Sequence, residues 1–152
     1  MQIVLDDPTR GDVTALLEEH LADMYATSPP ESVHALDPAS LTGSDIPFWT
    51  LREDGALLGC SALKRLEPGH GEIKSMRTAT AARRRGVATA LLDHVLAEAR
   101  AAGYERLSLE TGTQDFFAPA RSLYASRGFA ECGPFGTYVL DPNSVFMTLD
   151  LA

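Results

Sequence analysis

Residues 83–102 read RRRGVATALLDHVLAEARAA, and the fold that we expect follows from this stretch. Its apolar residues recur at helical spacing from Val87 to Ala99 and form one face. Gly103 comes next, and glycine best tolerates the left-handed conformation that follows a helix. The stretch therefore predicts a basic turn followed by an amphipathic helix over 87–102.

The basic turn in front of this helix has the chemistry of an anion site. A glycine-containing turn at a helix start exposes backbone N–H groups and the positive end of the helix dipole, which together favour a pyrophosphate. The three arginines at 83–85 add charge-assisted donors for phosphate oxygens. The alternative is an ordinary basic helix start on the surface, because one such turn is not specific.

Upstream, the chain begins with a predicted strand over 2–5 and then a helix. Thr9 followed by Asp12 resembles a weak capping box where that helix should start. His20 lies on its apolar stripe, and we expect a packed or rim histidine there rather than a catalytic one. The segment 31–45 mixes helical and turn signals, which favours a loop with a short helix.

Three strand-like runs lead up to the basic turn, over 48–52, 57–66 and 72–78. Turn-forming residues separate them, which predicts an antiparallel meander. The elements after the helix are a strand, a helix and a last strand, over 106–110, 119–127 and 145–151. A strand-helix-strand unit in this second half favours one parallel pair of strands, which is where we expect a ligand.

The composition fits one soluble domain. The chain has 152 residues, of which 45% are hydrophobic and 22% charged. A net charge of -8 argues against a nucleic-acid partner, which would need a clustered positive face. No apolar run is long enough to cross a membrane and no secretory leader is evident, so we expect no membrane association and a cytoplasmic protein.

Cysteines and histidines show no metal-site pattern. Cys60 and Cys132 have neither zinc-site spacing nor the density of a disulfide scaffold, so we expect reduced thiols in the core or at its rim. The four histidines lack a His-x-x-x-His pair. We therefore predict no metal.

Two motifs resemble the GNAT superfamily of N-acetyltransferases. Arg83, Gly86 and Ala88 match its acyl-CoA motif, which is Arg or Gln, two variable residues, Gly, one variable residue, then Gly or Ala. Residues 123–129, LYASRGF, resemble its Leu-Tyr-x-x-x-Gly-Phe segment. Further stretches are similar to a small bacterial subfamily of undefined substrate, and they are 71–76, 109–112 and 142–147.

The resemblance implies the GNAT fold, an α+β sandwich of helices flanking a mixed, mostly antiparallel sheet with splayed parallel strands. It also implies acetyl-CoA as the donor, with the pantetheine arm along a strand and the pyrophosphate on the basic turn. Phe117 stands where the family asparagine would be expected, and Gln114 is the nearby substitute. The implied donor-site residues are Met76, Arg77, Thr78, Arg83, Arg84, Arg85, Gly86, Val87, Ala88, Thr89 and Gln114.

Three residues are candidates for catalysis. Tyr124 matches the family tyrosine that protonates the leaving CoA thiolate, a role that suits a phenol. Glu72 precedes Arg83 by the offset at which histone-acetylating GNATs place a general-base glutamate, and Glu110 competes for this role. Alternatively, Glu72 is a solvated charge or a partner of Lys74, Glu110 is a salt-bridge partner, and water chains remove the proton.

The acceptor implied by the resemblance is a primary amine that attacks the thioester directly in a ternary complex. We expect a small molecule, with an amino acid, an antibiotic, a protein lysine or an N-terminus left open. The segment 29–45 and the region of Tyr138 should shape its pocket, with His34, Trp49 and Phe135 as candidates by position.

Two further alternatives concern function and assembly. A non-catalytic acyl-CoA-binding regulatory module would keep the phosphate turn without turnover. The apolar segment 135–140 leaves a homodimer open.

Overall fold

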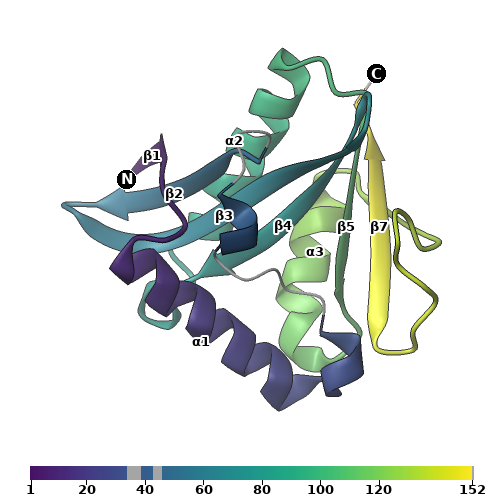
Figure 1. Cartoon of the computed structure of the whole chain (residues 1–152), viewed down its shortest axis with the longest axis horizontal. Helices are drawn as coiled ribbons and strands as arrows, with labels where there is room; N and C mark the ends of the chain where they lie inside the picture. Colours follow the sequence, from purple (N-terminus) through teal and green to yellow (C-terminus); the bar gives the residue numbers. More distant parts are fainter. Residues whose placement is uncertain (34–38, 43–45, 152) are drawn as a thin grey trace.

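The computed structural model describes residues 1–33, 39–42 and 46–151. Within them, seven strands form one sheet in the order β1-β2-β3-β4-β5-β7-β6 (Figure 1). The strands are β1 (Gln2–Leu5), β2 (Phe48–Glu53), β3 (Ala56–Glu67), β4 (His70–Thr78), β5 (Arg106–Gly112), β6 (Ala130–Cys132) and β7 (Ser144–Asp150). The helices are α1 (Gly11–Thr27), α2 (Val87–Ala101) and α3 (Ala118–Ser126), with 3-10 turns at Pro30–Ser32, Ala39–Leu41, Thr80–Ala82 and Asp115–Phe117.

The helices cover both faces of the sheet. The apolar stripe of α2 packs with α3 residues against β4, β5 and β7 in the largest core cluster, and Leu92, Val95 and Leu107 in it are fully buried. Val13 and Leu17 of α1 pack in a separate cluster with side chains of β2 and β3. Figure 1 shows α1 in front of the sheet, with α2 and α3 behind it. The expected α+β sandwich with a mixed, mostly antiparallel sheet is confirmed.

The predicted elements occur with small shifts at their ends. The meander β2–β3–β4 is antiparallel as expected. Its first turn, at Asp54 and Gly55, has both residues at positive φ. The predicted capping box is wrong: Thr9 bonds Asp7, Asp12 bonds Arg52, and no side chain caps α1.

Strand β6 was not expected, because three residues are too few to show a period of two. The short helix expected within 31–45 lies partly outside the described residues. What is described there is a pair of 3-10 turns.

A bulge in β4 separates the two parallel strands. Cys60 pairs with Arg77 but Ala62 pairs with Lys74, so β4 carries one extra residue opposite β3, and Ser75 in this stretch has φ 55°. Parallel pairing of β4 with β5 is confined to His70–Glu72 against Arg106–Ser108. Beyond the pairing, the two strands leave room for a cavity between them.

A close approach of α2 to the meander fixes the position of the basic turn. A Cβ atom at Gly59 would lie 2.6 Å from Val87 Cγ1 and 2.8 Å from the Arg77 carbonyl oxygen. The first turn of α2 is therefore held directly against β3 and the end of β4. This contact places the basic turn beside the part of β4 that lies after the bulge.

None of the helices among the described residues is long and apolar enough to cross a membrane. Both cysteines are free thiols, Cys60 in the core and Cys132 half-buried, as expected. In the segment 135–140, Phe135 and Tyr138 pack on Phe146, while Val139 and Leu140 are exposed.

Candidate active site

A cleft of about 410 Å³ lies where the basic turn meets β4. It is lined by nearly all of the residues expected to hold the donor, together with aromatic and small side chains of the α3 region. Those expected residues are Met76, Arg77, Thr78, Arg83, Arg84, Gly86, Val87, Ala88 and Thr89. The strand and the turn predicted to act together are thus brought together.

The turn presents unpaired backbone donors to this cleft. Gly86 is the N-cap of α2 with φ 78°, and no side chain caps the helix. Arg84 is also left-handed, with φ 66°. Successive N–H groups in such a turn, at the positive end of a helix, form a concave anion site. These donors and the basic side chains fit the pyrophosphate of a CoA thioester.

The arginines of the turn have different surroundings. Arg83 lies over the Phe116 ring at 5.4 Å and pairs with Asp23 at 3.6 Å, and it lines the cleft. Arg85 pairs with Glu53 at 2.9 Å and is not among the cleft residues. Its side chain therefore faces the meander rather than the expected phosphates.

Gln114 lines neither cavity of this region. Its amide donates to Asn143 at 3.1 Å and its oxygen accepts from Ser28 at 3.5 Å, so it joins α1 to the segment before β7. Phe117, by contrast, lines both the cleft and a second cavity. An aromatic side chain therefore lies at the place where the resemblance implied an asparagine.

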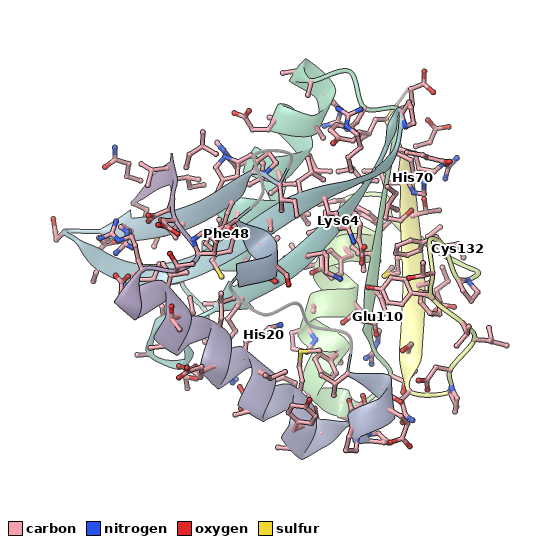
Figure 2. The ribbon with its side chains drawn as sticks, viewed as in Figure 1. His20, Phe48, Lys64, His70, Glu110 and Cys132 are labelled. Carbon is pink, nitrogen blue, oxygen red and sulfur yellow. The ribbon has the colours of Figure 1, made fainter. Side chains whose placement is uncertain are left out.

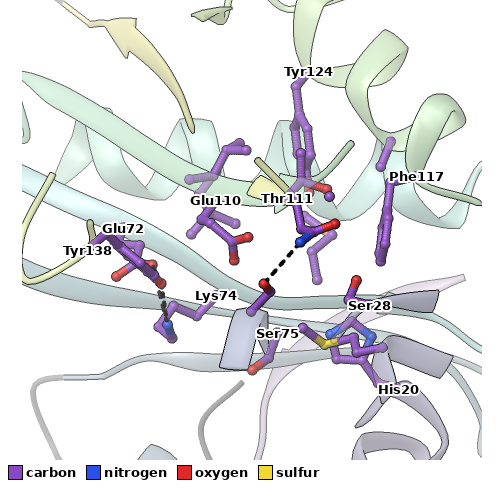
Figure 3. A pocket seen from close by; sticks show the side chains of 18 residues that line it. His20, Ser28, Glu72, Lys74, Ser75, Glu110, Thr111, Phe117, Tyr124 and Tyr138 are labelled. Atoms are coloured by element: carbon purple, nitrogen blue, oxygen red, sulfur yellow. Dashed lines mark hydrogen bonds and ion pairs between the residues drawn. The ribbon is translucent and has the colours of Figure 1, made fainter. Parts of the chain in front are cut away.

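The second cavity, of about 110 Å³, lies between β4 and β5 where the strands separate (Figure 3). Its polar lining comes from α1, both strands and the segment before β7. These residues include His20, Ser28, Ser32, Glu72, Lys74, Ser75, Glu110, Thr111, Tyr138 and Asn143. In Figure 2, Glu110 and His20 both lie in the region between α1 and β5.

Tyr124 lies at the junction of the cleft and the cavity. It lines both, as do His20, Met76, Phe117 and Ala120. Figure 3 shows its ring extending from α3 into the pocket. Burial raises the pKa of its phenol, so the hydroxyl keeps its proton across the physiological range.

Glu110 projects into the cavity between Tyr124 and the Glu72 side (Figure 3). Burial raises the pKa of this carboxyl to about 7, and the negative charges of Glu72 and Asp141 add to the effect. The Ser144 hydroxyl and the Lys74 ammonium act in the opposite direction. A carboxyl with this pKa exchanges protons readily near neutral pH.

Glu72 is held by polar contacts with Lys74 and Tyr138. Its Oε2 accepts from the Tyr138 hydroxyl at 2.6 Å and from Lys74 Nζ at 3.3 Å. Lys74 Nζ also donates to the Tyr138 oxygen at 3.0 Å. The side chain of Glu72 is 4% exposed and that of Lys74 9%. Lys74 is therefore the partner that was one of the alternatives for Glu72, and Tyr138 is a second.

His20 and Cys60 are not poised for proton transfer or attack. Burial, aided by the charge of Arg77, lowers the pKa of His20 to about 4, so its ring is neutral at pH 7. Burial raises the pKa of Cys60 to about 12, which keeps the thiol protonated. Both agree with the packing roles expected of them.

Of the three residues expected by their position to line the acceptor pocket, neither of the two that the structure describes lines the cavity. His34 lies outside the described residues. Trp49 is buried against His94 on the α2 face, away from the cavity, and Phe135 packs on Tyr138 without lining it. Both were wrong as pocket residues, because position in the chain did not predict which face their side chains take.

Lys74 and Asn143 are cavity residues that sequence reasoning did not assign to the acceptor side. Lys74 is on β4 and Asn143 precedes β7, and neither stands in a recognisable motif. In the described part of the chain, no three His, Cys, Asp or Glu side chains form a group that could hold a metal ion.

Comparison with known proteins places the chain among acetyltransferases. The family model described as "Acetyltransferase (GNAT) family" matches residues 13–129. The chain is 54% identical to "Uncharacterized N-acetyltransferase YsnE" of Bacillus subtilis (strain 168), over 99% of this chain and 100% of that protein. It is 48% identical to "Uncharacterized N-acetyltransferase YedL" of Escherichia coli (strain K12), over 98% of this chain and 94% of that one.

Among solved structures, a putative acyl-CoA N-acyltransferase from Klebsiella pneumoniae is similar. The TM-score is 0.80 with 28% sequence identity, and the match covers 99% of this chain and 97% of the other. The similarity extends over nearly the whole of both chains, so the two proteins share the same overall fold.

Proposed function

Because the chain belongs to the acetyltransferase (GNAT) family, we propose that it transfers an acetyl group from acetyl-CoA to the primary amine of a small molecule. The observation that carries the proposal is the meeting of the two cavities at Tyr124. One cavity has the chemistry of a phosphate and thioester site, and the other has carboxylates that suit an amine. A ternary complex would place the two reactants in contact there.

The donor is held by main chain more than by side chains in this proposal. The pyrophosphate lies on the N–H groups of Val87 to Thr89, and the pantetheine arm follows the free edge of β4 at residues 76–78. Arg83 and Arg84 add charge at the rim, whereas Arg85, bound to Glu53, contributes less. The thioester then reaches the junction near Tyr124.

Glu110 is the general base that the geometry favours. An alkyl ammonium must lose a proton before it can attack, and Glu110 accepts that proton directly or through a water. Its carboxylate faces the cavity, and its pKa of about 7 matches the task at neutral pH. Glu72 is less suited, because its Oε2 already accepts two hydrogen bonds.

Tyr124 completes the transfer as the acid. The neutral amine forms a bond to the thioester carbonyl carbon, and the carbon–sulfur bond breaks as the tetrahedral adduct collapses. The phenol gives its proton to the departing thiolate, which leaves as free CoA thiol. The adduct nitrogen loses its second proton to the Tyr124 phenolate, which restores the phenol. The first proton passes from Glu110 to solvent, so the reaction releases an N-substituted acetamide, CoA and one proton.

Thiol release from acetyl-CoA with a panel of small amines tests the proposal. In the wild type, we expect kcat/KM to rise with pH through a group near 7. Glu110→Gln should remove this rise and lower kcat roughly 100-fold, and Tyr124→Phe should lower kcat by a similar factor while acetyl-CoA still binds. Tyr104→Phe, which removes a hydroxyl outside both cavities, serves as the control.

Two outcomes would contradict parts of the proposal. Saturable acetyl-CoA binding with no turnover of any amine would favour the non-catalytic binding module. A pH profile that is unchanged in Glu110→Gln but lost in Glu72→Gln would transfer the base role to Glu72.

A further inference from the structure

The set formed by Glu72, Lys74 and Tyr138 restricts what the acceptor cavity can bind. Its three members close a triangle of hydrogen bonds, with the Tyr138 hydroxyl 2.6 Å and Lys74 Nζ 3.3 Å from the same Glu72 oxygen (Figure 3). A phenol has one proton, and Tyr138 gives it to Glu72. The hydroxyl therefore has no proton left for a substrate carboxylate.

The ammonium of Lys74 is matched inside the same set. Its partner Glu72 and the ammonium itself are both nearly buried, so their attraction is weakly screened by solvent. A substrate carboxylate that approached Lys74 Nζ would come close to Glu72 Oε2, which lies 3.3 Å from that nitrogen. Like charges in a poorly solvated site repel strongly, so the set opposes an incoming anion.

Among the lining residues that the structure describes, the remaining charge is negative. With Glu72 and Lys74 cancelling, ionised Glu110 leaves a charge of about -1 on this described lining, and Asp141 adds negative potential at Glu110. Arg77, a cation that lines the neighbouring cleft, is paired with Glu19 and Asp23. One ammonium balances this lining, whereas a zwitterion brings an extra negative charge and a diamine an extra positive charge.

The cavity is also small. Its volume of about 110 Å³ is below the ~150 Å³ of an engineered protein cavity that holds benzene. Only a few heavy atoms of an acceptor can enter between β4 and β5. A large multiply charged amine would have to leave most of its atoms outside.

We propose that the acceptor is a compact primary amine with one positive charge and no carboxylate, and that the Glu72–Lys74 pair excludes amino acids. This inference rests on the proposed acetyl transfer and names the class of its substrate. The charge pair acts on specificity, Tyr138 supplies a hydrogen bond to Glu72, and Glu110 remains the base.

Glycinamide and glycine make the sharpest comparison, because they have nearly the same size and differ in the carboxylate. In the wild type, we expect kcat/KM for glycinamide to exceed that for glycine at least 50-fold, on the order of the repulsion between like charges at an interface. Glu72→Gln removes the negative charge that lies 3.3 Å from Lys74 Nζ and repels a substrate carboxylate, so the preference should fall at least about 10-fold. Comparing this ratio between variants cancels the different intrinsic reactivities of the two amines.

Two further variants separate a local effect from a general one. Glu131→Gln removes an exposed carboxylate on β6 and should leave the ratio unchanged. Tyr138→Phe keeps the ring and removes the hydrogen bond to Glu72, but the charges of Glu72 and Lys74 remain. The preference for glycinamide should therefore persist. Butylamine and putrescine, compared in the same way, test the preference for a single charge.

A wild-type enzyme that uses glycine as well as glycinamide would overturn the inference, and so would a ratio that Glu72→Gln does not change. Binding of both amines to the CoA-loaded protein, measured by calorimetry, gives the same ratio without turnover. Absence of turnover with every amine would overturn the proposed function, while the binding ratio would still decide the preference of the cavity.

Discussion

Glu110 shows how one residue couples the site to stability. The pKa of its carboxyl is about 7 in the folded protein against an ordinary value of 4.5, so the folded state binds the proton more tightly. Stability associated with the bound proton is therefore full at low pH and is lost as the pH rises through about 7. The buried carboxyl of Glu110 thus costs folding free energy at neutral pH.

This reasoning predicts that Glu110→Gln changes the pH dependence of folding. From pH 5 to pH 8 the free energy of unfolding of the wild type should fall relative to that of the variant by roughly 2 to 3 kcal/mol. Chemical denaturation at a series of pH values measures this difference. Parallel curves for the two proteins would show that Glu110 has an ordinary pKa.

At the scale of elements, the contact of α1 with β4 depends on a buried guanidinium. Arg77 of β4 is 4% exposed and pairs with Glu19 and Asp23 of α1, whose side chains are 40% and 34% exposed. The carboxylates can be hydrated if the arginine is removed, but the arginine cannot if the carboxylates are removed. The two deletions should therefore have unequal effects.

We expect the double variant Glu19→Gln, Asp23→Asn to lose about 3 kcal/mol of unfolding free energy, because it leaves a buried charge unpaired. The Arg77→Met variant should lose less than half as much unfolding free energy, because it removes the buried charge. Urea denaturation of both proteins provides the measurement. A greater loss in Arg77→Met would mean that the arginine stabilises the fold by packing rather than by charge.

The start of α2 requires a residue that tolerates a positive φ at position 86. Gly86 has φ 78°, whereas proline is restricted to about -65°, so Gly86→Pro must reorganise the turn that we propose holds the pyrophosphate. We expect this variant to lose at least about 30-fold in acetyl-CoA affinity by calorimetry, on the scale of one lost charge-assisted hydrogen bond.

Replacement of Arg85 is the matched control for that measurement. Its side chain faces Glu53, so Arg85→Gln should change the affinity less than threefold. Equal losses in the two variants would indicate that the turn acts through its net positive charge instead of its backbone.

At the scale of the whole molecule, the sequence predicted most elements and the donor site but only part of the acceptor site. Helix α2 and the meander were predictable because a period of 3.6 or 2 is repeated within one short window. The basic turn was found because its residues are consecutive. The bulge at Ser75 was not foreseen, since a single extra residue leaves no periodic signal.

Trp49 and Tyr138 show that local sequence patterns did not predict the side chains around the acceptor cavity. Trp49 was expected near the acceptor but packs on the α2 face, because its strand position gives it the opposite orientation. For Tyr138, the sequence predicted only that its region of the chain would shape the acceptor pocket. Its contact with Glu72 joins positions 66 residues apart, a separation over which local pattern carries no information.

By itself, the sequence determined the order of most strands and helices, the glycine turn with its arginines at the start of α2, and the place of Tyr124 in a family motif. Each of these depends on the conformation or identity of neighbouring residues. Only the tertiary structure showed that Glu72 accepts hydrogen bonds from Lys74 and Tyr138, that Glu110 faces the cavity, and that the cavity is small. Burial, charge pairing and cavity volume arise when distant segments pack together, and the packing of the two parallel strands around the β4 bulge brings these segments together.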